Sequence, residues 1–229
     1  SSAASDVYKR QAQDHKRISD GDMGANTGGM GAYAPAPVMT KELDKIVYDT
    51  ILMPAVKAMK KEGCPFKGCL YAGLMITKDG PKVVEFNCRF GDPETEAILP
   101  LLESDLAKIM LACTKGTLKK EKVEWKNACA VDVVLASEGY PATHSSGEEI
   151  VGLEEAKKTG CLVFHAGSMK KKGRYFVNGG RVLNVAAVAP TLKEARDKAY
   201  EGVSKISWRG MQYRHDIADK GLKRSKKGK

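Results

Sequence analysis

The block Val83–Glu94, which reads VVEFNCRFGDPE, constrains the fold of this chain more than any other stretch. An apolar run, Leu70–Ile76, and the turn Lys78-Asp79-Gly80 come directly before it. An apolar run, a glycine turn and a second alternating run predict a β-hairpin over residues 70–87. We therefore expect the rest of the chain to be arranged around an antiparallel pair of strands.

The second predicted strand carries a row of polar side chains. Side chains alternate along a strand, so Glu85, Asn87 and Arg89 share one face, with steps of about 6–7 Å between them. Carboxylate and amide oxygens suit Mg²⁺, which takes further ligands from water and phosphate, and the arginine fork suits a phosphate or carboxylate. The row is typical of a magnesium–nucleotide site. The alternative is a half-buried strand whose polar face is solvated and has no chemical role.

The residues after the row favour the first interpretation. Gly91 frees the backbone to turn sharply out of the strand, and Asp92-Pro93-Glu94 predicts the start of a helix. Two more carboxylates and a helix N-terminus, whose amide dipoles attract anions, therefore follow the row directly.

A glycine-rich segment, residues 20–33, lies nearer the N-terminus. Gly28, Gly29 and Gly31 would let backbone amides approach a ligand closely, as in loops that cradle phosphate. The spacing matches neither a P-loop nor the G-x-G-x-x-G pattern of dinucleotide sites, and a flexible connector is the alternative. His15, just before this segment, is interpreted as a polar loop residue rather than a catalytic base.

We predict an α+β fold built from four segments. Residues 1–11 have no apolar periodicity and are interpreted as a tag, linker or non-native leader. Residues 12–118 form a first domain with the hairpin and flanking helices, and residues 119–219 form a small α+β domain. Residues 220–229 form a basic tail that is expected to be disordered.

The remaining elements follow from apolar periodicity, caps and turn residues. A helix over residues 40–63, capped by Thr40, is expected to bend near Pro54. Further helices are expected over residues 93–99 and 104–115, and a last helix capped by Thr191. Strands are expected over residues 128–136, 162–167, 175–177 and 181–189.

Composition excludes several classes of protein. The chain has 229 residues, of which 42% are hydrophobic and 29% charged, values typical of a soluble globular protein. No run is long enough to span a membrane, and the six cysteines are scattered without a zinc or disulfide pattern. The net charge of +10 suits phosphorylated ligands without requiring a nucleic acid, because six of the basic residues lie in 220–229.

Six sequence blocks together carry a family resemblance. They are Asp14–Arg17 (DHKR), Asn26–Tyr33 (NTGGMGAY), Leu70–Leu74 (LYAGL), Glu85–Thr95 (EFNCRFGDPET), Phe164–Gly167 (FHAG) and Asn178–Leu183 (NGGRVL). Taken in order, they resemble the phosphoribosylamine–glycine ligases, a family of ATP-grasp enzymes. The resemblance implies the C-terminal part of an ATP-grasp domain, with an antiparallel sheet and flanking helices, followed by a small α+β domain. It also implies the ATP-dependent joining of glycine to 5-phosphoribosylamine in purine synthesis, through glycyl phosphate.

The resemblance further implies roles for individual residues. Glu85 and Asn87 would hold Mg²⁺ (or Mn²⁺) against the phosphates of ATP, the co-substrate. Arg89 would bind the transferring phosphoryl group, and Asp92 is the second catalytic candidate. The remaining candidates are Leu74 and Met75 for the adenine pocket, Gly28, Gly29, Met30 and Gly31 as amide donors to phosphoribosylamine or glycine, Glu94 for an amine, and Asn178, Gly179 and Arg181 for the sugar-phosphate side.

The chain departs from the family in two respects. Gly73 lies where many ATP-grasp relatives carry a second metal-binding acid. The family chain is also much longer, so we expect a C-terminal fragment that lacks the N-terminal half of the same enzyme and is inactive alone. No nucleic-acid or membrane partner is expected, and the expected location is cytoplasmic, with an organelle left open. The alternatives are an ATP-grasp ligase with another acceptor and a basic nucleic-acid-binding module.

Overall fold

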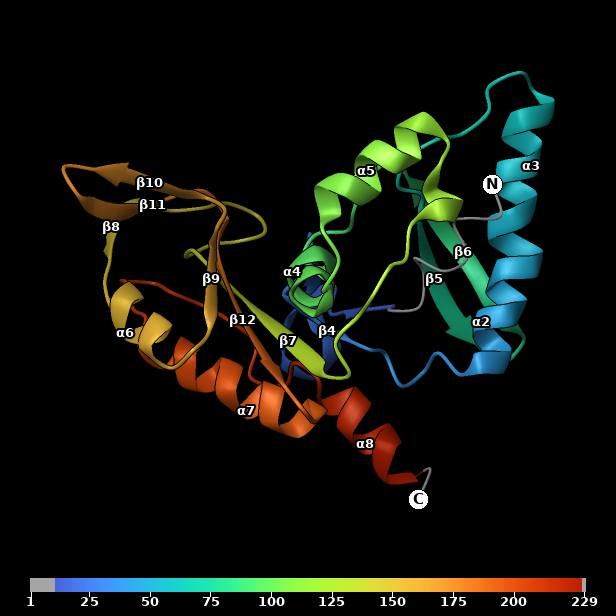
Figure 1. Ribbon diagram of the computed structural model, residues 1–229. Coiled ribbons are helices and arrows are strands. Elements are labelled where there is room, and N and C mark those ends of the chain that lie inside the picture. The colour runs from blue at the N-terminus through green and yellow to red at the C-terminus, as the bar shows by residue number, and fades with distance from the viewer. Residues whose placement is uncertain (1–10, 228–229) are drawn as a thin grey trace. The chain divides into compact units, whose positions relative to one another are not determined.

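The computed structural model describes residues 11–227 and divides into two compact units (Figure 1). The helix–hairpin unit contains residues 37–91 and 102–126. The five-stranded unit contains residues 12–36, 92–101 and the chain from 127 onward. Parts of the expected first domain, residues 12–36 and 92–101, therefore pack with the C-terminal part of the chain. The expected leader, residues 1–11, lies almost entirely outside the described residues.

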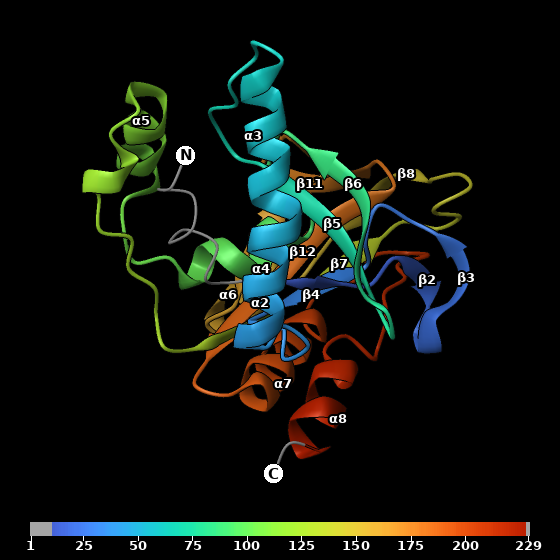
Figure 2. The same cartoon turned by 90° about the vertical axis from the view of Figure 1, so that its right-hand side faces the viewer.

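One long helical run begins the helix–hairpin unit. It consists of α2 (Lys41–Val47), a π-helical turn η2 (Tyr48–Leu52) and α3 (Met53–Lys61), which continue one another in Figure 2. Thr40 caps it as expected, because its Oγ1 accepts a hydrogen bond from the Leu43 amide at 3.2 Å. The irregular turn lies where a bend near Pro54 was expected. Proline has no N–H to donate to the carbonyl four residues earlier, and its ring crowds that carbonyl.

The predicted hairpin is present as β5 (Tyr71–Thr77) and β6 (Gly80–Asn87), paired antiparallel from Thr77↔Gly80 to Tyr71↔Asn87. The helical run lies alongside it in both views (Figure 1, Figure 2). The unit ends with α5 (Leu106–Lys115) and a short 3₁₀ turn, η4 (Leu118–Lys120). Asp105 caps α5, since its Oδ1 accepts a hydrogen bond from the Ala107 amide at 2.8 Å.

The five-stranded unit is built on an antiparallel sheet with strand order β1-β4-β7-β12-β9. Its strands are β1 (Gln13–Asp14), β4 (Gly31–Ala34), β7 (Cys129–Ala136), β12 (Arg181–Ala189) and β9 (Leu162–His165). β7 and β12 are buried along almost their whole length, because both faces of the sheet are covered.

Two helices cover the opposite faces of this sheet. Val131, Val133 and Leu135 of β7 pack with α7 (Leu192–Val203), whose start is fixed by a capping box between Thr191 and Glu194. Alternation sends Asp132 to the other face, where α4 (Glu94–Ile98) and the turn η3 (Leu99–Leu101) contact β4 and β7. This second face carries the candidate site.

Smaller elements complete the unit. They are the pair β2 (Arg17–Ser19) and β3 (Met23–Asn26) around the turn η1 (Asp20–Asp22), the sheet β10 (Ser168–Lys171), β11 (Arg174–Asn178) and β8 (Ser146–Ile150), and the helices α6 (Leu153–Lys158) and α8 (Asp219–Lys227). Of these elements only β11 was predicted, because the sequences of the others are short or rich in charge.

The prediction of a disordered tail from residue 220 is wrong over α8. A Cβ atom at Gly221 would lie 2.7 Å from Tyr33 Cε2 and 2.8 Å from Leu192 Cδ2, so the helix packs closely on the core there. Lys220 forms an ion pair with Asp22. Within the described residues, no helix is both long and apolar enough to cross a lipid bilayer.

Candidate active site

The hairpin of the helix–hairpin unit carries the predicted metal ligands. Glu85 pairs with Gly73 and Asn87 pairs with Tyr71 in the β5–β6 register. Two positions apart on one strand, the Glu85 and Asn87 side chains share a face. A Cβ atom at Gly73 would lie 3.1 Å from Glu85 Cγ, so the glycine leaves room for the Glu85 side chain across the strands. The structure thus places a glycine, and no second acid, opposite Glu85.

The donor chemistry of this pair fits a hard divalent cation. The Glu85 side chain is exposed, and Asn87 Nδ2 is buried without a hydrogen-bond partner among the described residues. In the described part of the chain, no three His, Cys, Asp or Glu side chains gather into a metal site. Glu85 and Asn87 could therefore hold Mg²⁺ only with water and phosphate oxygens completing its shell, as is usual at nucleotide sites.

Three other candidates of this unit depart from the prediction. β6 ends at Asn87, so Arg89 lies beyond the strand, and alternation does not extend the row to it. Its Nη1 donates to the carbonyl of Phe90 at 2.9 Å. Leu74 and Met75 are adjacent on β5, and adjacent strand residues point to opposite faces. Their side chains therefore do not share a face, and their role at an adenine pocket stays a prediction.

The five-stranded unit brings together candidates from three remote parts of the sequence. Arg181, the first residue of β12, donates from Nη1 to Asp92 Oδ1 at 2.8 Å. The same nitrogen lies 3.4 Å from the Asp92 carbonyl and 3.5 Å from the Gly29 carbonyl. The Arg181 side chain is 21% exposed and that of Asp92 55% exposed, so a ligand can reach the pair.

The glycine-rich segment contributes shape rather than free amides. The amide of Gly28 donates to the Tyr140 hydroxyl, that of Gly29 to Thr27 Oγ1, and that of Met30 to the His15 carbonyl, each at 2.9 Å. The prediction that these three amides face a ligand is therefore wrong, because acceptors in the chain already satisfy them. Met30 is fully buried, and Gly31 is part of β4.

Gly29 shows why this segment needs glycine. Its φ is +124°, and a Cβ atom there would lie 2.3 Å from Pro93 Cδ and 2.8 Å from Asp14 Oδ1. The backbone thus passes directly against the start of α4 and against a buried acid. No other residue fits this conformation and this space.

Buried carboxyl groups lie around the Arg181–Asp92 pair. Burial raises the pKa of Asp14 to about 6, although Lys16 Nζ lies 2.5 Å from its Oδ2 and opposes the shift. Burial also raises the pKa of Glu96, as does the charge of Asp92. Glu94 is buried as well, at 5% exposure. Carboxyl oxygens beside one guanidinium suit an ammonium or amine group of a ligand.

A fully buried acid underlies the same face of the sheet. Burial raises the pKa of Asp132 well above its ordinary value, and a hydrogen bond from Asn184 Nδ2 to Asp132 Oδ2 at 2.9 Å opposes this. The Asp132 Oδ1 has no hydrogen-bond partner within the described residues. Removal from water favours the neutral form of this carboxyl group.

Asn178 and Gly179 lie at the turn between β11 and β12. A Cβ atom at Gly179 would lie 3.1 Å from Gly167 Cα, so glycine here permits close approach of two backbone segments. The Asn178 amide donates to the Gly167 carbonyl at 2.8 Å, while the Asn178 side chain is exposed. The structure gives Gly179 a packing role and leaves Asn178 accessible.

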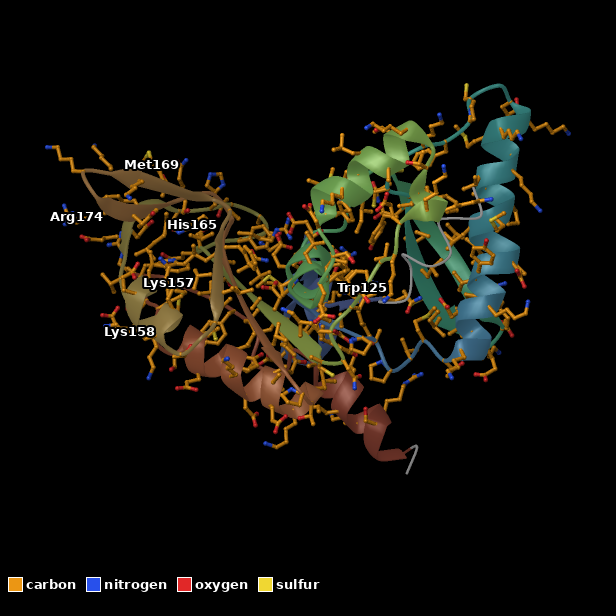
Figure 3. The ribbon with its side chains drawn as sticks, in the orientation of Figure 1. Trp125, Lys157, Lys158, His165, Met169 and Arg174 are labelled. Atoms are coloured by element: carbon orange, nitrogen blue, oxygen red, sulfur yellow. The ribbon has the colours of Figure 1, made fainter. Side chains whose placement is uncertain are left out.

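His15 lies in the loop between β1 and β2, as expected, but it is buried. It is 1% exposed, its Nδ1 lies 3.2 Å from the Gly31 carbonyl, and burial lowers its pKa to about 4. His165 instead lies on the surface, 2.7 Å from Ser168 Oγ and stacked on Tyr175. Figure 3 shows His165 at the end of β9.

Two residues that contact the site were not predicted. Asp14 stands in the basic run DHKR, and an acid at the head of that run was its only signal. Tyr140 lies in the turn Gly139-Tyr140-Pro141, whose sequence indicates a turn and nothing more. Their contacts with the glycine-rich segment depend on the tertiary fold.

Comparison with known families gives two matches along the chain. A family model described as the ATP-grasp (A) domain of phosphoribosylglycinamide synthetase matches residues 4–95, and its C domain model matches residues 130–220. The hairpin site and the first match define an ATP-grasp protein. Because the two models together cover most of the chain, it belongs to the phosphoribosylglycinamide synthetase, or phosphoribosylamine–glycine ligase, family. The first match begins within the segment that was expected to be a leader.

Individual relatives agree with this assignment. The chain is 51% identical over 217 residues to the chloroplastic phosphoribosylamine–glycine ligase of Arabidopsis thaliana, covering 93% of this chain and 41% of that protein. It is 52% identical over 212 residues to the trifunctional purine biosynthetic protein adenosine-3 of Gallus gallus, covering 92% of this chain and 21% of that protein. The crystal structure of phosphoribosylamine–glycine ligase from Thermotoga maritima matches with a TM-score of 0.79 and 40% identity, over 90% of this chain and 50% of that one. The chain thus spans half or less of the length of these relatives.

Proposed function

We propose that this chain supplies the metal-binding hairpin and the substrate-side residues of a ligase that joins glycine to 5-phosphoribosylamine. In this proposal it acts together with the segment that forms the other half of its relatives, and it acts in the cytoplasm. The products are glycinamide ribonucleotide, ADP and phosphate. Family membership supports the reaction class, and the arrangement of the candidate residues supports their roles.

The proposed reaction has two steps. A carboxylate oxygen of glycine attacks the γ-phosphorus of ATP, ADP leaves, and glycyl phosphate forms. The amine of phosphoribosylamine then attacks the glycyl carbonyl carbon, phosphate leaves, and the nitrogen loses a proton. Transfer of a phosphoryl group depends chiefly on positioning and on neutralising charge, so the protein needs cations and a metal rather than a nucleophile.

The residues of this chain divide these tasks. Glu85 and Asn87 would hold Mg²⁺, whose charge would offset that of the ATP phosphates. Arg89, which is exposed and donates only to a neighbouring carbonyl among the described contacts, binds the transferring group. Asp92, half-exposed and beside the buried Glu94, accepts hydrogen bonds from the ammonium of glycine or from the attacking amine. Arg181 binds the phosphate of phosphoribosylamine.

The contact of Arg181 with both Asp92 and Gly29 carries this proposal. It joins three of the sequence blocks on which the family resemblance depends, although these blocks lie far apart in the chain. A guanidinium next to carboxylates, reachable from solvent, provides a place for a substrate with both a phosphate and an amine.

The test is reconstitution of the longer enzyme. The chain would be fused behind the N-terminal half of the Arabidopsis relative, and ADP release measured with glycine and phosphoribosylamine present or omitted one at a time. We expect ADP release only with both substrates, and loss of it in an Asp92→Asn variant. A Glu121→Gln variant, altered at an exposed acid of the helix–hairpin unit, should retain it. ADP release that needs another acceptor in place of phosphoribosylamine would refute the proposal.

A further inference from the structure

Tyr140 joins three parts of the five-stranded unit. Its hydroxyl oxygen accepts the hydrogen bond of the Gly28 amide at 2.9 Å. Its ring lies against Gly180, where a Cβ atom would come within 2.4 Å of Tyr140 Cδ2. Its carbonyl accepts from Gln212 Nε2 at 3.0 Å. Packing of the ring, a hydrogen bond at the hydroxyl and a hydrogen bond at the backbone carbonyl therefore hold Tyr140 in one position.

Arg181 lies against Gly28, the glycine whose amide donates to Tyr140. A Cβ atom at Gly28 would lie 3.0 Å from Arg181 Cζ, 3.1 Å from Nη2 and 3.2 Å from Nε. Gly28 itself is exposed. The Tyr140 hydroxyl and one edge of the guanidinium thus flank a single solvent-accessible residue that has no side chain.

Both groups have donors to offer there. The Tyr140 oxygen already accepts a hydrogen bond, and no acceptor for its own hydrogen occurs among the described residues. Arg181 uses Nη1 for Asp92 and Gly29, while the described contacts include no acceptor for Nη2 or Nε. Accepting the amide hydrogen bond polarises the phenol and strengthens its O–H as a donor.

We propose that Tyr140 is a substrate-binding residue, which donates its phenolic hydrogen to a phosphate oxygen of a phosphorylated sugar bound beside Arg181 and Gly28. The identity of that sugar as phosphoribosylamine rests on the proposed function. The chemistry of the site does not, since a hydroxyl donor next to an arginine fork recognises an anionic oxygen on any phosphate monoester.

The first measurement is equilibrium binding of ribose 5-phosphate to this chain, with unphosphorylated ribose as the reference ligand. The Tyr140→Phe variant keeps the ring against Gly180 and loses only the hydroxyl. We expect it to bind ribose 5-phosphate about tenfold more weakly, because a hydrogen bond to a charged group is lost. A matched Tyr175→Phe variant removes a hydroxyl from β11 and should bind as the wild type does.

Amide hydrogen exchange distinguishes a ligand-binding role of Tyr140 from a purely structural role in the glycine-rich segment. If Tyr140→Phe changes only the exchange of residues 23–34 and leaves ribose 5-phosphate affinity unchanged, Tyr140 merely braces the loop and the proposal is overturned. Failure of the wild-type chain to bind ribose 5-phosphate also overturns it.

The fused enzyme then distinguishes this inference from the proposed function. We expect Tyr140→Phe to raise the KM for phosphoribosylamine about tenfold, with kcat and the KM for ATP nearly unchanged. A variant that only destabilised the fold would lower kcat through loss of active enzyme. An active fusion with an unchanged KM refutes the Tyr140 role alone. An inactive wild-type fusion whose ribose 5-phosphate binding still requires Tyr140 refutes the ligase proposal alone.

Discussion

Asp14 and His15 are adjacent, and burial shifts the pKa values of their side chains in opposite directions. The two shifts therefore change the free energy of unfolding in opposite senses as the pH falls. Burial, together with the charge of Arg214, lowers the pKa of His15 from 6.5 to about 4. The folded protein therefore resists protonation of His15, and stability is lost as the pH falls from 6.5 toward 4. Burial raises the pKa of Asp14 from 3.8 to about 6. The folded protein therefore favours protonated Asp14, and stability is gained as the pH falls from 6 toward 3.8.

In the wild-type chain the contribution of Asp14 offsets only part of the contribution of His15. Proton linkage with these values gives a loss of about 2 kcal/mol from His15 between about pH 7 and about pH 5, and a gain of about 1 kcal/mol from Asp14. Asp14→Asn removes the compensating gain, so its acid destabilisation should exceed that of the wild type by about 1 kcal/mol. His15→Asn removes the loss, so this variant should become more stable over the same range.

Urea unfolding followed by the fluorescence of Trp208 provides the assay. Trp208 is nearly buried in the five-stranded unit, and a Trp125→Phe background leaves it as the sole indole. Other carboxylates affect all variants alike and cancel in the comparison. Equal pH dependence in the wild type and Asp14→Asn would refute the reasoning for Asp14. Acid destabilisation in His15→Asn equal to that of the wild type would refute it for His15.

Three further predictions concern the metal site, the glycine-rich segment and the ion-pair core. In the fused enzyme, Glu85→Gln should lower turnover at limiting Mg²⁺ by at least about tenfold with little change in melting temperature, because the side chain is exposed; turnover near normal would exclude the metal role. Gly29→Ala should lower the free energy of unfolding, measured with urea, by about 3 kcal/mol, and Gly173→Ala by only about 1 kcal/mol. Both glycines have positive φ, but only Gly173 is surrounded by open space, so equal losses would contradict the steric argument. Arg214→Met should cost about 3–5 kcal/mol, because the fully buried guanidinium pairs with Asp22 and Asp216; a loss below about 1 kcal/mol would show that the network is dispensable.

Much of the secondary structure could be predicted from short-range patterns. The hairpin, the Thr40 cap and the strand over residues 181–189 all depend on alternation, turn residues or a side chain within a few positions. Such signals are local and need no tertiary contact. The same approach missed β8 and placed the tail in disorder, because Ser146–Ile150 and the Lys-rich α8 pack against neighbours remote in sequence. It also missed β10, whose partner β11 is close in sequence but whose own residues Ser168–Lys171 lack a strand pattern.

Part of the candidate site could likewise be predicted from local patterns, and part depends on tertiary contacts. The Glu85–Asn87 pair follows from strand alternation, and the structure retains it, whereas Arg89 fell outside the row because β6 ends at Asn87. The glycines of the N-terminal segment were expected to offer their amides to a ligand. The folded chain instead satisfies those amides internally, with acceptors such as Tyr140 that lie more than a hundred positions away.

The sequence by itself determined the family, the hairpin and the identity of the polar residues available for chemistry, since these depend on residue types and their spacing. Only the tertiary structure decided which of these residues meet. Arg181, Asp92 and Gly29 come together because β4, α4 and β12 pack on one sheet, and burial in that packing shifts the pKa values of Asp14, His15 and Asp132. Desolvation and hydrogen-bond saturation are properties of the packed chain, so no pattern of neighbouring residues could reveal them.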